Sequence, residues 1–325
     1  MYATVLPEID FLGTGWVHTQ LFCYMERIME LKRPINCDEQ IQMLRTHGIV
    51  INDESFARLV LNNVGYYRLT GYALQYRKDT NSSDLSSPIS LEHLYHIYKF
   101  DEKLRSLLRR YLEICEVYYR TQIADGFALR ECIQPPHNQH YDEKNFYKKD
   151  VYNSVMESFN KERDYYKDGP IVKHHMAKYE GKMPIWVMTE LLSFSSLSRL
   201  YSAMYNTDKE CIAKNCGTTS KTLEKHLHCL SVLRNKCAHC SRLYNAKMTP
   251  PVRLSKSFLT KHPEINNTDL SAYIIMLMMR LPDKRSKTNL LSDMTRLINE
   301  ESYDIDLSQI GMTDKYLDLL VQLSK

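Results

Sequence analysis

Glycine and proline are scarce in this chain, with 10 and 11 residues among 325. They are the strongest breakers of regular structure, so long segments run without interruption. The sequence also lacks any alternation of apolar and polar residues longer than a few positions, which is the pattern of a half-buried strand. These absences argue against a β-sandwich or barrel and predict an all-α protein.

Signals for export or membrane insertion are missing as well. The first ten residues lack the basic start and apolar core of a signal peptide, and the most apolar later stretch, 272–281, is too short to span a bilayer. The nine cysteines are an odd number and are scattered, so we expect free thiols in a reducing compartment. The sequence therefore predicts a cytoplasmic protein without a membrane partner.

Positive charge is concentrated in one part of the chain. The net charge is only +4, but the window 221–261 holds nine basic residues and one acidic residue, a local net of +8 that leaves −4 for the rest. Such a block attracts polyanions. A solvated basic face, without any partner, is the alternative interpretation.

Apolar residues recur at steps of three and four along much of the chain, which predicts amphipathic helices. Asp38, Asp53 and Ser220 are expected N-caps, and Pro184 fits the first turn of a helix. We expect helices over 17–31, 40–46, from Asp53 onward, 91–129, 151–166, 184–204, from Ser220 onward, 268–281, 286–300 and 313–324.

The basic block contains an unusual group of polar residues. Arg234 shares a helix face with Leu227 and Leu230, and a guanidinium on an apolar stripe is costly unless it is paired. Asn235, His239 and Arg242 follow at spacings i, i+4 and i+7, which places them on a neighbouring face. The pattern therefore predicts two guanidiniums, an amide and an imidazole close together.

This combination suits phosphodiester cleavage of RNA. Histidine transfers protons near neutral pH, and arginine presents a planar fork to phosphoryl oxygens. No metal or other cofactor is required, and the sequence shows no cluster of carboxylates suited to magnesium. Because one histidine cannot easily be both acid and base, a second copy across a homodimer axis is expected.

Other interpretations of these residues remain open. Arg234 and His239 can belong to a buried polar network in which Asn235 satisfies the histidine and a glutamate pairs with the arginine. Zinc is a further option, because several potential ligands crowd one stretch, but they surround a single helix instead of flanking turns. The potential zinc ligands are His226, His228, Cys229, Cys237, His239 and Cys240.

Two other segments carry candidate contacts. Glu116 and Arg120 form an i, i+4 pair, either as an exposed ion pair or with Glu116 or Glu113 orienting Arg234. The 66–68 segment can clamp a nucleotide or form a packed aromatic corner. The supporting residues are Glu116, Arg120, Arg242 and Asn245. The expected RNA contacts are Tyr66, Tyr67, Arg68, Lys236, Lys247 and Arg253.

Four ordered motifs carry a family resemblance: YYRLTGY at 66–72, LYHIYKFDEKLR at 94–105, PIWVMTELLSF at 184–194 and LRNKCAHCSRLYN at 233–245. Together they resemble the Abi-like bacterial abortive-infection proteins of the AbiD/AbiF group, over residues 31–250. The resemblance implies a HEPN-type helical bundle, with helical extensions at 1–30 and 251–325. Two positions depart from the family pattern: Ser195 replaces a usual glycine and is expected to alter only helix packing, and Cys240 stands where a second histidine is frequent.

The resemblance also implies a function in phage defence. In the HEPN superfamily, an Arg-x4–6-His motif carries metal-independent endoribonuclease activity, and Arg234, Asn235 and His239 match it. The expected enzyme is a homodimer that leaves a 2′,3′-cyclic phosphate and is regulated by a small structured RNA. The alternative is a module of a toxin–antitoxin-like system that binds structured RNA without cutting it.

Overall fold

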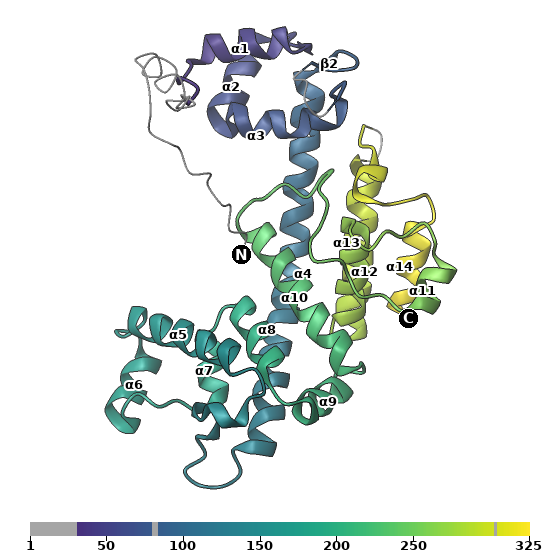
Figure 1. Ribbon diagram of the computed structural model, residues 1–325. Helices are drawn as coiled ribbons and strands as arrows, with labels where there is room; N and C mark the ends of the chain where they lie inside the picture. Colours follow the sequence, from purple (N-terminus) through teal and green to yellow (C-terminus); the bar gives the residue numbers. More distant parts are fainter. Residues whose placement is uncertain (1–30, 80–83, 302–303) are drawn as a thin grey trace, which may run out of the picture.

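The computed structural model describes residues 31–79, 84–301 and 304–325, and its architecture is all-α, as predicted (Figure 1). The expected helix over 17–31 lies outside the described residues. The helices in the first half are α1 (Cys37–Thr46), α2 (Glu54–Val64), α3 (Tyr66–Thr70), α4 (Leu91–Glu131), α5 (Lys149–Tyr165) and α6 (Pro170–Tyr179). Those in the second half are α7 (Ile185–Leu191), α8 (Phe194–Ala203), α9 (Asn206–Asn215), α10 (Ser220–Ala238), α11 (Lys256–Lys261), α12 (Leu270–Arg280), α13 (Lys284–Glu301) and α14 (Tyr316–Ser324).

Helix α4 is the central element, and the other helices are arranged along it (Figure 1). Its N-cap is Ser90, whose side chain accepts a hydrogen bond from the backbone N–H of His93. Its buried residues recur with helical spacing over the whole length, so it contacts helices on several sides. Helices α1–α3 lie at one end, α5–α9 gather at the other, and α10 packs alongside.

The strands are confined to one short pair in the described part of the chain. Strand β1 (Ile49–Val50) runs parallel to β2 (Ile89–Ser90), with Ile49 opposite Ile89. This pair joins the start of α4 to the α1–α2 unit. It therefore helps to hold the N-terminal helices against the end of α4.

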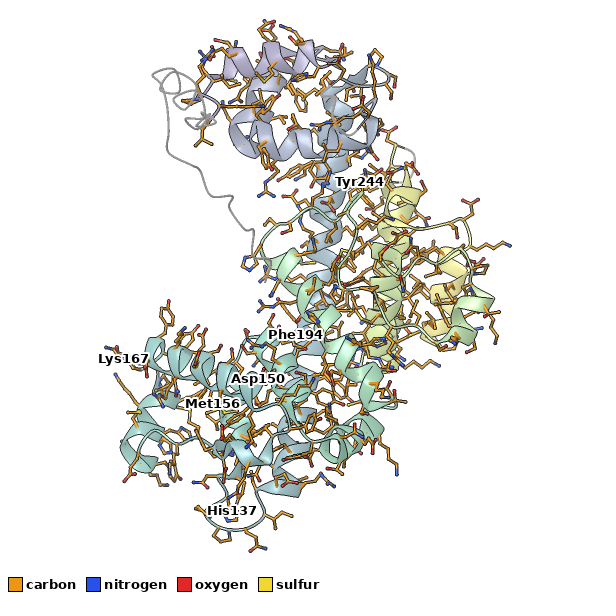
Figure 2. The ribbon with its side chains drawn as sticks, viewed as in Figure 1. His137, Asp150, Met156, Lys167, Phe194 and Tyr244 are labelled. Atoms are coloured by element: carbon orange, nitrogen blue, oxygen red, sulfur yellow. The ribbon has the colours of Figure 1, made fainter. Side chains whose placement is uncertain are left out.

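The C-terminal helices complete the main core. Residues 270–278 of α12 are all buried, and α12 packs against α4, α10 and α14. Tyr244 lies next to these helices (Figure 2), where its hydroxyl donates to the carbonyl of Asp306 at 2.9 Å. Residues 251–325 thus share a core with the segment before them.

Several expected helix boundaries were wrong. The helix predicted over 184–204 is divided into α7 and α8, because Ser193 adopts an extended conformation and caps α8. Asn36 caps α1 in place of Asp38, and Thr219 caps α10 in place of Ser220. Helices α6 and α9 were not predicted. Asp53 caps α2, as expected.

Among the described residues, none of the helices combines the length and apolar character that crossing a membrane requires.

Candidate functional site

Helix α10 has one buried apolar side and one polar side. Leu223, Leu227, Leu230 and Leu233 are fully buried, where α10 packs against α4, α8 and α12. Arg234 comes directly after Leu233 and lies at the edge of this apolar side, and its side chain is 35% exposed. The guanidinium is therefore partly removed from water and needs a partner, as its position in the sequence predicts.

Glu116 on α4 supplies that partner. Its Oε2 accepts a hydrogen bond from Arg234 Nε at 3.1 Å, and its Oε1 pairs with Arg120 Nη2 at 2.6 Å. Arg120 also donates to the backbone carbonyl of Thr189 in α7. The Glu116 and Arg120 side chains are 9% and 11% exposed, so this is not a surface ion pair. Glu113, the other expected partner, instead pairs with Arg109 in an exposed contact.

Asn235 connects Arg234 to α8. Its Oδ1 accepts from Arg234 Nη1 at 3.4 Å, and its Nδ2 donates to Ser195 Oγ at 3.0 Å. Ser195 therefore does more than alter helix packing, which was the expectation for this departure from the family pattern. One part of the buried-network interpretation is present, because Arg234 pairs with a glutamate. The other part, a bond between the side chains of Asn235 and His239, is not what the structure has: the Asn235 side chain bonds Arg234 and Ser195 instead.

The chain reverses direction immediately after His239. The backbone N–H of Ser241 donates to the carbonyl of Lys236 at 2.8 Å, and that of Cys240 donates to the carbonyl of Cys237. Cys240 has a φ of 53°, so these bonds form a Schellman motif with a left-handed residue. His239 is the C-cap of α10 and is exposed. The prediction that Arg242 continues the helix face of Asn235 and His239 was wrong, because α10 ends at Ala238.

A buried aspartate fixes the segment that follows this reversal. Asp101 on α4 is fully buried and accepts hydrogen bonds from the backbone N–H groups of Leu243 and Tyr244. The same carboxylate accepts from the Tyr72 hydroxyl at 2.7 Å and pairs with Arg105 at 2.5 Å. Asp101 thereby joins α4, the 3₁₀ helix Gly71–Tyr76 and the chain after α10 at one point.

A groove of about 960 Å³ lies between these joined segments. Arg68 bridges it by donating to the carbonyl of Cys240 at 2.6 Å, and Arg242 donates to the carbonyl of Gly71. Tyr67 is 93% exposed at its edge. Five expected site residues line the groove, namely Tyr66, Tyr67, Arg68, His239 and Arg242. Arg234 is not one of its lining residues, because it faces Glu116 on α4.

The Arg234 network and the groove, apart from Gln40, fall within one matched region. The family model described as Abi-like protein matches residues 59–245. The chain belongs to the Abi-like protein family. The match begins within α2 and ends just after Tyr244, so it includes both sides of the groove and the Asp101 contacts that join them. Neither a curated protein nor a solved structure matches the chain.

The remaining expected RNA contacts of this Abi-like chain and the expected supporting residue Asn245 are dispersed. Lys247 pairs with Asp269 at 2.6 Å, so its charge is already compensated. Arg253 is exposed on the segment between α10 and α11, and Lys236 lies in the last turn of α10. Asn245 has a positive φ of 48° at the end of the matched region. None of these four residues lines the groove.

The histidines and cysteines of the basic block have separate surroundings. His226 Nε2 hydrogen-bonds to the carbonyl of Arg253 at 2.8 Å, and the Cys229 thiol donates to the carbonyl of Pro250. Cys237 is buried, which raises the pKa of its thiol to about 12. Within the described ranges, no three His, Cys, Asp or Glu side chains are grouped so that they could hold a metal ion.

Sequence analysis missed one polar set. On α8, four residues at spacings i, i+3, i+4 and i+7 share a face and line a pocket against α10. The sequence predicted one helix over 184–204, so these residues were not recognised as one face of a separate helix. The serine-rich run after Phe194 could have indicated a polar face. These α8 residues are Ser195, Ser198, Arg199 and Ser202. Phe194, beside them, is fully buried close to α4 and α10 (Figure 2).

Proposed function

We propose that this Abi-like protein is an RNA-acting phage-defence protein and a metal-independent endoribonuclease of the HEPN type. One observation supports this most directly. An exposed histidine, His239, stands at the end of α10 on a groove that aromatic and cationic side chains line. The Arg-x4-His spacing of the superfamily ends at this residue.

The proposed roles follow from the positions of the side chains. His239 acts as the general acid or base on the 2′-hydroxyl or the leaving oxygen. Arg234 stabilises the phosphorane, and Glu116 and Asn235 orient its guanidinium. Tyr67 offers an exposed ring on which a base can stack. The product is a 2′,3′-cyclic phosphate, and a small structured RNA restrains or triggers cleavage.

Two subunits are part of this proposal. On a helix with 3.6 residues per turn, a step of five residues turns by about 140°, so Arg234 and His239 of one chain point in different directions. Arg234 faces α4, whereas His239 faces the groove. We therefore place the complete site across a homodimer, with the arginine and histidine contributed by different chains.

The test is incubation of the purified protein with labelled RNA in EDTA. The wild-type protein should cleave the RNA and leave a cyclic phosphate, whereas His239→Ala should lose cleavage by about 100-fold or more, the contribution of a general acid or base. His262→Ala is the matched control, because that histidine is the C-cap of α11 and does not line the groove. Equal cleavage by His239→Ala and the wild-type protein would refute the proposal.

A non-cleaving RNA-binding module is the second candidate, favoured by the contacts of Arg68 and Arg242. Both guanidiniums bond backbone carbonyls, so they hold the two sides of the groove together and keep their positive charge at it. A fixed, positively charged groove can bind RNA without cutting it. In this case RNA stays intact, binding weakens steeply with salt, and His239→Ala has little effect on affinity. Arg234→Ala would then lower the affinity.

A further inference from the structure

A second hollow, of about 380 Å³, lies between α8 and α10. The four α8 residues described above line one side. From α10 come residues on the same helix face as Asn235 and His239, because steps of three and four return to one face. These α10 residues are Glu224, Lys225, His228, Ser231 and Val232. We call this hollow the α8–α10 pocket.

The polarity of the α8–α10 pocket is unusual for the seam between two packed helices. Apolar side chains normally fill such a seam, but Val232 is the only apolar residue that lines the pocket. Ser198 is 5% exposed there, and its hydroxyl has no hydrogen-bond partner in the part of the chain that the structure describes. This hydroxyl is therefore free to bond a polar ligand that enters the pocket.

The charge of the pocket is positive. Arg199, Lys225 and His228 are exposed at its rim. Within the described residues, neither Arg199 nor Lys225 forms an ion pair. Glu224 is the one acidic residue of the lining, and Lys148 and Lys209 pair with it at 3.1 and 3.0 Å. Two cations therefore face the pocket without a compensating anion.

We propose that the α8–α10 pocket binds a phosphate group of the RNA backbone, at a distance from the bond that is cut. Arg199 offers a fork and Lys225 a point charge for phosphoryl oxygens, and the hydroxyls of Ser195 and Ser198 add two donors. The hydroxyls of Ser202 and Ser231 already donate to backbone carbonyls. A nucleobase would need a flat apolar or aromatic surface, which this pocket lacks. This inference rests on the proposed function, because it concerns the same RNA strand.

Position connects the pocket to the proposed catalytic residues. Ser195 lines the pocket and also accepts the hydrogen bond from Asn235, the neighbour of Arg234. His228 in the pocket and His239 in the groove lie on one face of α10, about 16 Å apart along the axis at 1.5 Å per residue. A single strand that follows this face reaches both places.

The test measures the affinity of the full chain for single-stranded 2′-O-methyl RNA, which cannot be cleaved because its 2′-oxygen is blocked. The variant is Arg199→Ala/Lys225→Ala. The control is Lys167→Ala/Lys284→Ala, which removes the same charge at two exposed lysines outside the pocket and outside the basic window 221–261. Lys167 lies at the far end of α5 (Figure 2).

The pocket variant should bind the oligonucleotide about tenfold more weakly at fixed salt. Its log–log salt slope should fall by about 0.7, since the pocket holds one phosphate and each phosphate contact of a single strand contributes roughly 0.7. A dinucleotide, too short to reach the pocket from the groove, should bind both variants equally. The control variant should keep the wild-type affinity and slope.

Equal affinity of the pocket variant and the control for the long oligonucleotide would overturn the inference. Competition by inorganic phosphate distinguishes the source of the anion: if phosphate binds the pocket while the variant keeps its RNA affinity, the pocket is a site for free phosphate and the inference fails. Cleavage of unmodified RNA is measured in parallel. Absence of cleavage by the wild-type protein counts against the proposed function. The RNA affinity of the pocket variant separately tests whether the α8–α10 pocket binds a phosphate of the RNA.

Discussion

At the level of single residues, Glu116 explains how a charged Arg234 lies at the edge of the apolar side of α10. Its two carboxylate oxygens each hold one guanidinium, and little of the group is exposed to solvent. A carboxylate in this position compensates the mostly buried Arg120 and the partly exposed Arg234 at once. Glu113, one turn earlier, pairs with Arg109 where both side chains are 59% exposed.

Glu116→Gln should destabilise the fold and disturb the site. The neutral amide leaves both guanidiniums without a counter-charge, which should lower the free energy of unfolding by about 2 kcal/mol. Urea denaturation measures this change. Glu113→Gln is the matched control and should change stability by less than about 0.5 kcal/mol, because exposed ion pairs contribute little. If the two variants are equally stable, the Glu116 network does not hold Arg234.

At the level of elements, α10 depends on a tether to the segment that follows it. His226 is 2% exposed and bonds the backbone carbonyl of Arg253. Burial lowers the pKa of His226 from 6.5 to about 4, because a charged imidazole is poorly solvated there. The folded protein therefore holds this histidine neutral, whereas the unfolded chain protonates it near pH 6.5.

The stability of the protein should therefore fall as the pH drops from 7 to 5. The folded pKa is the lower one, so the contribution of neutral His226 is present above pH 6.5 and is lost progressively toward pH 4. Between pH 7 and 5 this histidine accounts for a loss of about 2 kcal/mol. Urea unfolding at both pH values measures it. His226→Gln should lose correspondingly less stability over the same interval, and an unchanged pH dependence would contradict the assignment.

The crossing of α4 and α9 depends on a residue without a side chain. A Cβ placed on Gly126 in α4 would collide with Cγ1 of Ile212 in α9. Helix α4 runs through this position although glycine is about 1 kcal/mol less favourable than alanine inside a helix. Close approach of the two helices therefore outweighs helix propensity here.

Gly126→Ala should destabilise the protein by about 1–3 kcal/mol, the usual cost of overpacking a core. Thermal or urea unfolding measures it. The double variant Gly126→Ala/Ile212→Ala should lose less than the sum of the two single changes, because the truncated isoleucine leaves room for the new methyl group. A stabilising effect of Gly126→Ala would show that α9 moves away without penalty.

At the level of the whole molecule, the proposed active site requires two copies of the chain. Arg234→Ala and His239→Ala should each abolish RNA cleavage. When the two variants are mixed and allowed to exchange subunits, one complete arginine–histidine pair should form in each mixed dimer, and cleavage should return. Light scattering measures whether each sample is dimeric. Mixed dimers without cleavage would place the whole site within one chain.

Residue patterns predicted most of the helical architecture but only part of the candidate site. The 3.6-residue periodicity over 91–129 anticipated α4 closely, because its buried positions face packed helices along its whole length. The break at Ser193 was not anticipated, since apolar residues continue across it and only the backbone turns. The position of Arg234 on an apolar stripe indicates a partner, and the sequence offers two candidates for it, Glu113 and Glu116.

By itself, the sequence determined that the chain is helical, where most helices lie, and which residue on α10 needs a counter-charge. Local spacing carries this information because burial repeats with the period of the helix. The tertiary structure alone decided that Tyr66, Tyr67 and Arg68 meet His239 across a groove. Asp101 on α4 brings these distant segments together by binding Tyr72 and the backbone of Leu243 and Tyr244. Periodicity indicates which side of a helix is buried, whereas the distant segment that it meets depends on the packing of the whole chain.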